Sequence, residues 1–217
     1  MKLKKIASLM LAGVMAISML AGCSGKGETK PEEPATGVNA NTVIAALDKK
    51  VTDKVTFTAS SSLQTTLEKA VQYAGVTDSS DIGTDALVKF DDKLSEDWFF
   101  TAASEPASED AVKKAASITY VEHVTNQANY NEKYIVDQLA QAIEDAKVYK
   151  RTNTIAELPD YTKTNYTVDK DEYYYSFDYT GEVAVVEVGD VVNNDVSYVI
   201  AFTITRTPTK TSVPSKG

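Results

Sequence analysis

Cysteine and histidine are almost missing from this chain of 217 residues, which has one of each, Cys23 and His123. A single cysteine cannot form a disulfide within the chain, so the domain must bury enough core to be stable without one. The same scarcity excludes zinc sites built from several histidines or cysteines. A Ser–His–Asp relay would have to use His123, and the Gly-x-Ser-x-Gly turn that presents a nucleophilic serine is missing.

Other motifs and one sign of charge are also scarce. The chain has neither a Gly-x-x-x-x-Gly-Lys-[Ser/Thr] phosphate loop nor a Gly-x-Gly-x-x-Gly dinucleotide turn, so no nucleotide cofactor is predicted. Lysine and arginine number 22 against 31 acidic residues, a net charge of −9. This balance repels phosphates and excludes nucleic acid as a partner. Seven acids between Asp78 and Asp97 lack the spacing of a helix–loop–helix calcium site, and we predict no metal there.

The first 23 residues have the order of an export signal. Lys2, Lys4 and Lys5 precede an apolar stretch over residues 6–20, which ends in Leu20-Ala21-Gly22-Cys23. The stretch is about 15 residues long, shorter than the roughly 20 residues that span a bilayer. A basic start, a short apolar region and small residues together predict a cleaved secretory signal.

Leu20-Ala21-Gly22-Cys23 resembles the lipobox of bacterial lipoproteins. The resemblance covers residues 1–23 and implies that a signal peptide, residues 1–22, is cut off before Cys23. It also implies a diacylglycerol on the Cys23 thiol and a further acyl group such as palmitate on its amine. Two or more acyl chains anchor a protein stably. The resemblance therefore implies an exported protein held by lipid at the outer face of the cell membrane.

Composition divides the rest of the chain into three parts. Residues 23–39 comprise the cysteine and a stretch of Gly, Lys, Glu, Pro and Thr, which predicts a disordered tether. Residues 40–207 have the apolar content of one globular domain. Residues 208–217 are again Pro, Thr, Ser and Lys without periodicity, which predicts a flexible tail.

Apolar spacing changes from helical to strand-like along the domain. Helices are predicted from Asn41, from Leu63 to Ala74, behind Ser108-Glu109-Asp110, and from Asn131 to Ala146. A short strand is predicted at Val55-Thr56-Phe57-Thr58, where β-branched residues alternate. In the second half, three strands are predicted at Asp171–Tyr179, Glu182–Val188 and Val196–Thr207. Turns at Thr180-Gly181 and Asn193-Asn194-Asp195 are predicted to separate them. This order predicts an α+β fold, in which helices of the first half pack on one face of a C-terminal antiparallel meander.

A run of aromatic residues offers the candidate binding site. Tyr173, Tyr175, Phe177 and Tyr179 fall on one side of a predicted strand, with Tyr174 opposite. Tyrosine combines a flat apolar ring with a polar rim, which suits stacking on sugars or anchoring a partner. We therefore select Tyr173, Tyr174 and Tyr175 as ligand- or partner-binding residues. The alternative is that one face packs under the helices, and burial is also predicted for Trp98-Phe99-Phe100.

Together these features predict a membrane-anchored extracytoplasmic lipoprotein that acts as a non-enzymatic binding or adapter domain. Its partner is the membrane, through lipid on Cys23, and an envelope protein or glycan. Two alternatives stay open: an envelope hydrolase that uses a pair of carboxylates, and a structural or assembly protein of the envelope. Whether the chain is an enzyme is left open, and no catalytic residue and no cofactor are predicted.

Overall fold

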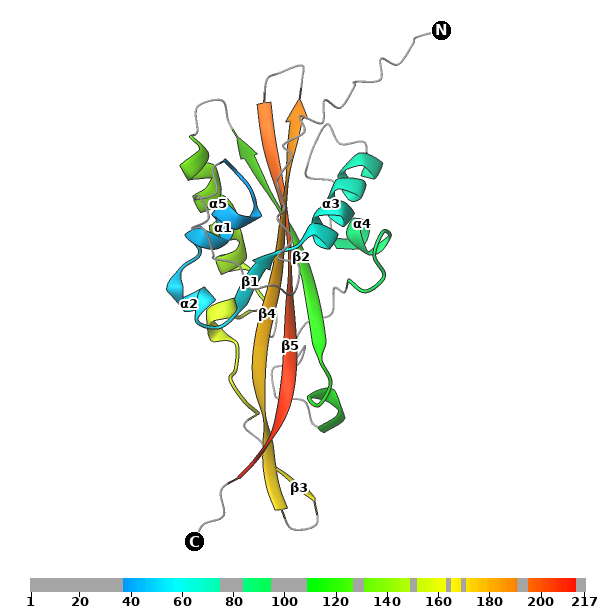
Figure 1. Ribbon diagram of the computed structural model, residues 1–217, viewed down its shortest axis with the longest axis vertical. Helices are drawn as coiled ribbons and strands as arrows, with labels where there is room; N and C mark the ends of the chain where they lie inside the picture. Colours follow the sequence, from blue (N-terminus) through cyan, green and yellow to red (C-terminus); the bar gives the residue numbers. More distant parts are fainter. Residues whose placement is uncertain are drawn as a thin grey trace, which may run out of the picture.

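Two strands of unusual length form the axis of the fold: β4 (Asp171–Asp190) and β5 (Asp195–Ser212). They pair as one antiparallel hairpin, from Asp190 opposite Asp195 to Tyr173 opposite Ser212. At about 3.3 Å per residue, β4 extends over about 66 Å, and Figure 1 shows that the hairpin runs the length of the molecule. The structure is a computed structural model that describes residues 37–74, 84–94, 109–126, 131–148, 152–162, 165–168, 171–190 and 195–213.

Three shorter strands complete a five-stranded mixed sheet. β2 (Ala116–Asn126) runs antiparallel to β5 along the edge opposite β4. The free side of β4 pairs antiparallel with β3 (Tyr166–Val168) and parallel with β1 (Thr56–Ala59). β3, β4 and β5 form an antiparallel meander, but β3 was not predicted, and the first two predicted strands are the single strand β4. The α+β class is confirmed. β1 confirms the short strand predicted at Val55-Thr56-Phe57-Thr58, and its parallel pairing with β4 makes the sheet mixed.

Helices lie on both faces of the sheet, so the prediction that they cover one face is wrong. α1 (Ala40–Ala46), α2 (Lys49–Thr52) and α5 (Glu132–Asp145) lie on one side in Figure 1. α3 (Ser61–Ala74) and α4 (Thr84–Val88) lie on the other side. Two separate apolar clusters result, because the upper part of the sheet presents apolar residues to both sides. Consecutive residues of β4 such as Val183 and Ala184 point to opposite faces and are therefore buried in different clusters.

Local sequence signals predicted two of these helices closely. α5 begins after Asn131, whose side chain accepts the backbone N–H of Tyr134, and it buries Ile135, Leu139 and Ile143. α3 buries Leu63 and Leu67 against the opposite face.

Two other helix predictions need correction. The N-cap of α1 is Asn39 rather than Asn41, because the Asn39 side chain accepts from two backbone N–H groups and forms a capping box with Thr42. Behind Ser108 there is only a short 3₁₀ helix, η2 (Glu109–Ala111), and β2 begins at Ala116. The β-branched residues around Ile118 prevail over the alanines before them, because Ile118 is buried in the sheet core.

The turn predicted at Thr180-Gly181 is also wrong, because β4 continues through it. Gly181 is buried beneath the ring of Phe57 from β1, where a Cβ atom would overlap ring carbons and lie 3.1 Å from the Thr203 carbonyl oxygen. The glycine therefore permits close packing between two strands rather than a reversal of the chain.

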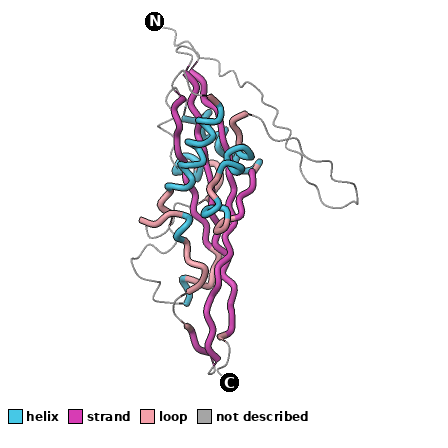
Figure 2. Tube along the Cα trace, turned by 90° about the vertical axis from the view of Figure 1, so that its left-hand side faces the viewer, coloured by secondary structure: helices cyan, strands magenta, loops and turns pink. Residues whose placement is uncertain are grey.

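The lower half of the hairpin has no α-helix beside it among the described residues. In Figures 1 and 2 the α-helices flank the upper half, while the lower half carries the strands and the short 3₁₀ segments η2 and η3 (Ile155–Glu157). β5 continues to Ser212, into the stretch that was predicted to be a tail, because these residues pair with the beginning of β4. None of the described helices has the length and apolar content that a membrane crossing requires.

Candidate functional site

The aromatic residues of β4 divide between two environments. Tyr173, Tyr175, Phe177 and Tyr179 lie on one side, as predicted, and are between 2% and 8% exposed in the larger apolar cluster. Tyr174 lies on the other side and is half-buried. Two of the three tyrosines selected from the sequence are thus part of the core, and only Tyr174 lies on the open face.

The buried tyrosines are held by one carboxylate. The hydroxyls of Tyr173 and Tyr175 donate to Oε1 of Glu109 at 2.9 and 2.7 Å, which joins η2 to β4. These hydrogen bonds, that from Tyr175 first, lower the pKa of Glu109. Burial, assisted by Glu109, raises the pKa of Tyr175 to about 12. The Lys210 ammonium lies 3.6 Å from the centre of the Tyr173 ring. This network satisfies the buried hydroxyls and explains the cluster as structure.

We expect the Glu109 network to make stability depend on acid pH. Because the pKa of Glu109 is lowered on folding, its ionised form stabilises the fold above its ordinary pKa of 4.5. That contribution is lost as the pH falls through the lower folded value. In urea unfolding, Glu109→Gln should be less stable than wild type at neutral pH, and the gap should narrow towards about pH 3. A gap that stays constant with pH would show that the ionised carboxylate contributes nothing.

On the other side of β4, Tyr174 meets an exposed tyrosine from a different segment. Tyr161 forms an isolated β-bridge with Ser176, which places its ring beside that of Tyr174. The two ring centres lie 6.0 Å apart at an angle of 72°, an edge-to-face arrangement. The Tyr161 side chain is 56% exposed. The segment that carries Tyr161 is held against β4, because Thr162 exchanges hydrogen bonds with the backbone of Tyr175.

Hydroxyl-bearing residues continue from this pair along the hairpin. Cross-strand partners point to the same side of a sheet, so Ser176 and Thr209, Asp178 and Thr207, and Thr180 and Thr205 form successive rungs. Asp178, Thr180, Thr207 and Thr209 are exposed. We call the whole surface the outer face; it comprises Tyr161, Tyr174, Ser176, Asp178, Thr180, Thr205, Thr207, Thr209 and Thr211.

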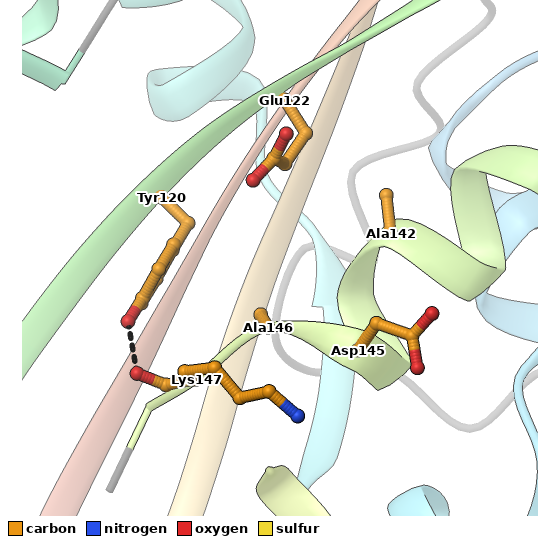
Figure 3. Close-up of a pocket in the computed structure, with 6 residues that line it drawn as sticks. All are labelled: Tyr120, Glu122, Ala142, Asp145, Ala146 and Lys147. Carbon is orange, nitrogen blue, oxygen red and sulfur yellow. Dashed lines mark hydrogen bonds between the residues drawn. The ribbon is translucent and has the colours of Figure 1, made fainter. Parts of the chain in front are cut away.

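A shallow groove of about 350 Å³ lies elsewhere, between β2 and the end of α5. In Figure 3, Tyr120 and Glu122 project from the strand, and Asp145 and Lys147 lie at the end of the helix, with the Asp145 carboxyl and the Lys147 ammonium turned away from the strand. The Tyr120 hydroxyl donates to the Lys147 carbonyl at 2.6 Å, and its ring stacks on Phe202. Tyr120 thus ties the helix end to the sheet, and its hydroxyl is already engaged. The rest of the lining is Ala142, Ala146 and the charged residues Glu122, Asp145 and Lys147.

The described residues give no sign of a catalytic or metal centre. No group of three or more possible metal ligands gathers among them. The carboxyls of Glu109, Asp110 and Glu157 have lowered pKa values, caused chiefly by hydrogen bonds from Tyr175, Lys113 and the Thr154 backbone. A general acid needs the opposite shift. His123 is half-buried in β2 opposite Val199.

Several residues singled out in the sequence lie outside the described residues. They are Cys23 with its lipobox, Trp98-Phe99-Phe100, and the acids Asp78, Asp81, Glu96 and Asp97. Conversely, sequence reasoning missed Tyr161 and the threonine rungs. The alternation of threonine over Thr203, Thr205, Thr207, Thr209 and Thr211 was a visible signal, which the expectation of a flexible tail obscured.

No protein-family model, no curated protein and no solved structure matches this chain. The outer face is consequently the main guide to function.

Proposed function

We propose that this chain is a lipid-anchored, extracytoplasmic binding domain that uses the outer face to hold an envelope partner. Lipid on Cys23 would concentrate the domain at the membrane, and the tether over residues 23–39 would set its reach. In this proposal the domain recognises its partner and does not alter it covalently.

The observation that carries this proposal is an aromatic pair, exposed Tyr161 and half-buried Tyr174, on a hairpin whose opposite side is buried. Tyr161 is 56% exposed, yet it contacts Tyr174 and bridges Ser176 of β4. The buried tyrosines and Glu109 brace the other side of the same strand. Exposed tyrosines on a rigid support lose little entropy on binding, and such residues frequently supply most of the binding energy.

The direct test is binding to envelopes from which lipid has been extracted, so that an acyl anchor cannot contribute. We expect the full chain to cosediment with them, and Tyr161→Ala/Tyr174→Ala to bind at least tenfold more weakly, since truncating a hot-spot residue costs about 2 kcal/mol or more. Tyr73→Ala is the matched control, because Tyr73 is 69% exposed and also forms an edge-to-face pair, with Phe90. Equal binding by the double variant and wild type would contradict the proposal.

The carboxylate-pair hydrolase finds less support. It needs one acid with a raised pKa facing a second acid across a cleft. Glu109, Asp110 and Glu157 are shifted the other way, and Glu109 is engaged with two tyrosines. An assembly role, by contrast, remains within the proposal when the partner is an envelope protein.

A further inference from the structure

The outer face differs in charge from the rest of the chain. From Tyr174 to Thr180 on β4 and from Thr205 to Thr211 on β5, the side chains on this face are tyrosine, serine and threonine, with Asp178 as the one charge. The positive charges of this stretch, Arg206 and Lys210, occupy the alternate positions and stack on Phe177 and Tyr173 on the opposite side. Alternation of side chains thus removes cations from the outer face.

This composition selects against charged partners. An anionic polymer would meet Asp178 and a chain with a net charge of −9, without any cation on the face to pair with it. A cationic peptide would find one carboxylate, Asp178, between Tyr174 and Thr180, and Glu172 and Glu182 one rung beyond either end. Hydroxyl groups, in contrast, both donate and accept hydrogen bonds, and a carboxylate accepts from them. The groups present match a partner that is itself rich in hydroxyls and uncharged.

The rings of Tyr161 and Tyr174, at one end of the rungs, match the apolar faces that sugar rings also have. A pyranose ring has an apolar face of C–H groups, which packs on the flat ring of tyrosine while its hydroxyls bind polar neighbours. Resting on the binding function proposed above, we infer that the outer face binds an uncharged glycan chain. One sugar ring packs against Tyr161 and Tyr174, and the following sugars lie along the rungs of Ser176, Asp178, Thr207 and Thr209.

The dimensions of the hairpin suit a linear chain rather than a single sugar. Successive rungs are two residues apart, about 6.7 Å, so the four rungs from Tyr174 to Thr180 extend over about 20 Å. They lie on two paired strands whose register is continuous across this stretch. Several sugars in a row could therefore contact the face together, and affinity should increase with the length of the oligosaccharide.

The inference can be tested by calorimetric titration of the full chain in mild detergent. The probes are cellohexaose and chitohexaose, which are neutral, and the hexamer of galacturonic acid, which is anionic. We expect a neutral hexamer to bind, its dimer to bind at least tenfold more weakly, and the anionic hexamer to bind at least tenfold more weakly. Absence of binding by both neutral hexamers at millimolar concentration would overturn the inference.

Substitutions that replace a hydroxyl with a methyl group locate the site. Thr207→Val/Thr209→Val keeps the β-branched shape and removes two hydroxyls, so the unfolding midpoint should be retained while glycan affinity falls at least tenfold. Thr65→Val, on the exposed side of α3, is the control and should bind as wild type. Unchanged affinity in the double variant would show that the glycan lies elsewhere, and would overturn the assignment to the rungs.

The two experiments distinguish a failure of the glycan inference from a failure of the proposed binding function. If neither neutral hexamer binds but cosedimentation with envelopes still requires Tyr161 and Tyr174, the glycan inference is wrong, and the outer face is still the binding surface for another partner. If cosedimentation is also indifferent to both tyrosines, the binding face itself is wrong, and the glycan inference fails with it.

Discussion

A Cys23→Ala variant is expected to incorporate no fatty acid, whereas the wild-type chain should be labelled by an alkyne-bearing fatty acid added to growing cells. Cys23 is the only cysteine in the chain, so no second thiol can receive a diacylglycerol. The difference should be close to all or none, which makes it the largest effect that we predict. Mass spectrometry of the mature wild-type chain should find Cys23, acylated, as its first residue.

A matched change next to the cysteine provides the control for this experiment. Ser24→Ala leaves Leu20-Ala21-Gly22-Cys23 intact, so labelling and cleavage should continue. Because two acyl chains give stable anchoring, the labelled forms should remain with membranes in high salt. Labelling that persists in Cys23→Ala, or a wild-type chain without lipid, would contradict lipid anchoring while leaving the outer face untouched.

Gly181→Ala is expected to destabilise the fold by about 1–3 kcal/mol, the usual cost of overpacking a core. An added Cβ would overlap the Phe57 ring and lie 3.1 Å from the Thr203 carbonyl oxygen. Phe57 is only 8% exposed, so its ring has little room to move away. The junction of β1 with the centre of β4 should be strained, and the urea midpoint should fall.

A double-mutant cycle identifies the cause. Phe57→Val introduces a β-branched residue that suits a strand and removes the ring atoms, so Gly181→Ala should cost less than half as much in this background. Thr180→Ala, the neighbouring position on the exposed outer face, should cost below about 1 kcal/mol. An equal cost for Gly181→Ala in both backgrounds would mean that backbone conformation, and not the Phe57 ring, requires glycine.

Periodic apolar residues made α3, α5 and the α+β class predictable. In α5, Ile135, Leu139 and Ile143 repeat at helical spacing behind the Asn131 cap, and no competing signal intervenes. The covering of both sheet faces was not predictable in this way, because it depends on which of several short helices meets which side of Val183 and Ala184. Those contacts join segments more than a hundred residues apart in the chain.

Glycine and threonine gave misleading local signals for the same reason. Gly181 is typical of a turn until Phe57 occupies the space above it, and Phe57 reaches it only through tertiary pairing. Threonines from Thr205 to Thr211 form a strand because β4 pairs with them, although Pro208 interrupts them.

The candidate site was only half visible from the sequence. The alternation of Tyr173, Tyr174 and Tyr175 was predictable, but which side is buried depends on Glu109, which lies 64 residues from Tyr173. Tyr161 reaches Tyr174 from a segment that pairs with β4 through an isolated bridge to Ser176. No local pattern predicts that contact.

The central claim is that the outer face is the binding surface of this protein. Cosedimentation of the tyrosine variants with lipid-extracted envelopes tests it most directly, because it assumes no particular ligand. The claim predicts at least a tenfold loss of affinity for Tyr161→Ala/Tyr174→Ala and less than a twofold change for Tyr73→Ala, which is the converse of the result expected for nonspecific adhesion. Equal affinities for all three proteins, with unchanged unfolding midpoints, would contradict it.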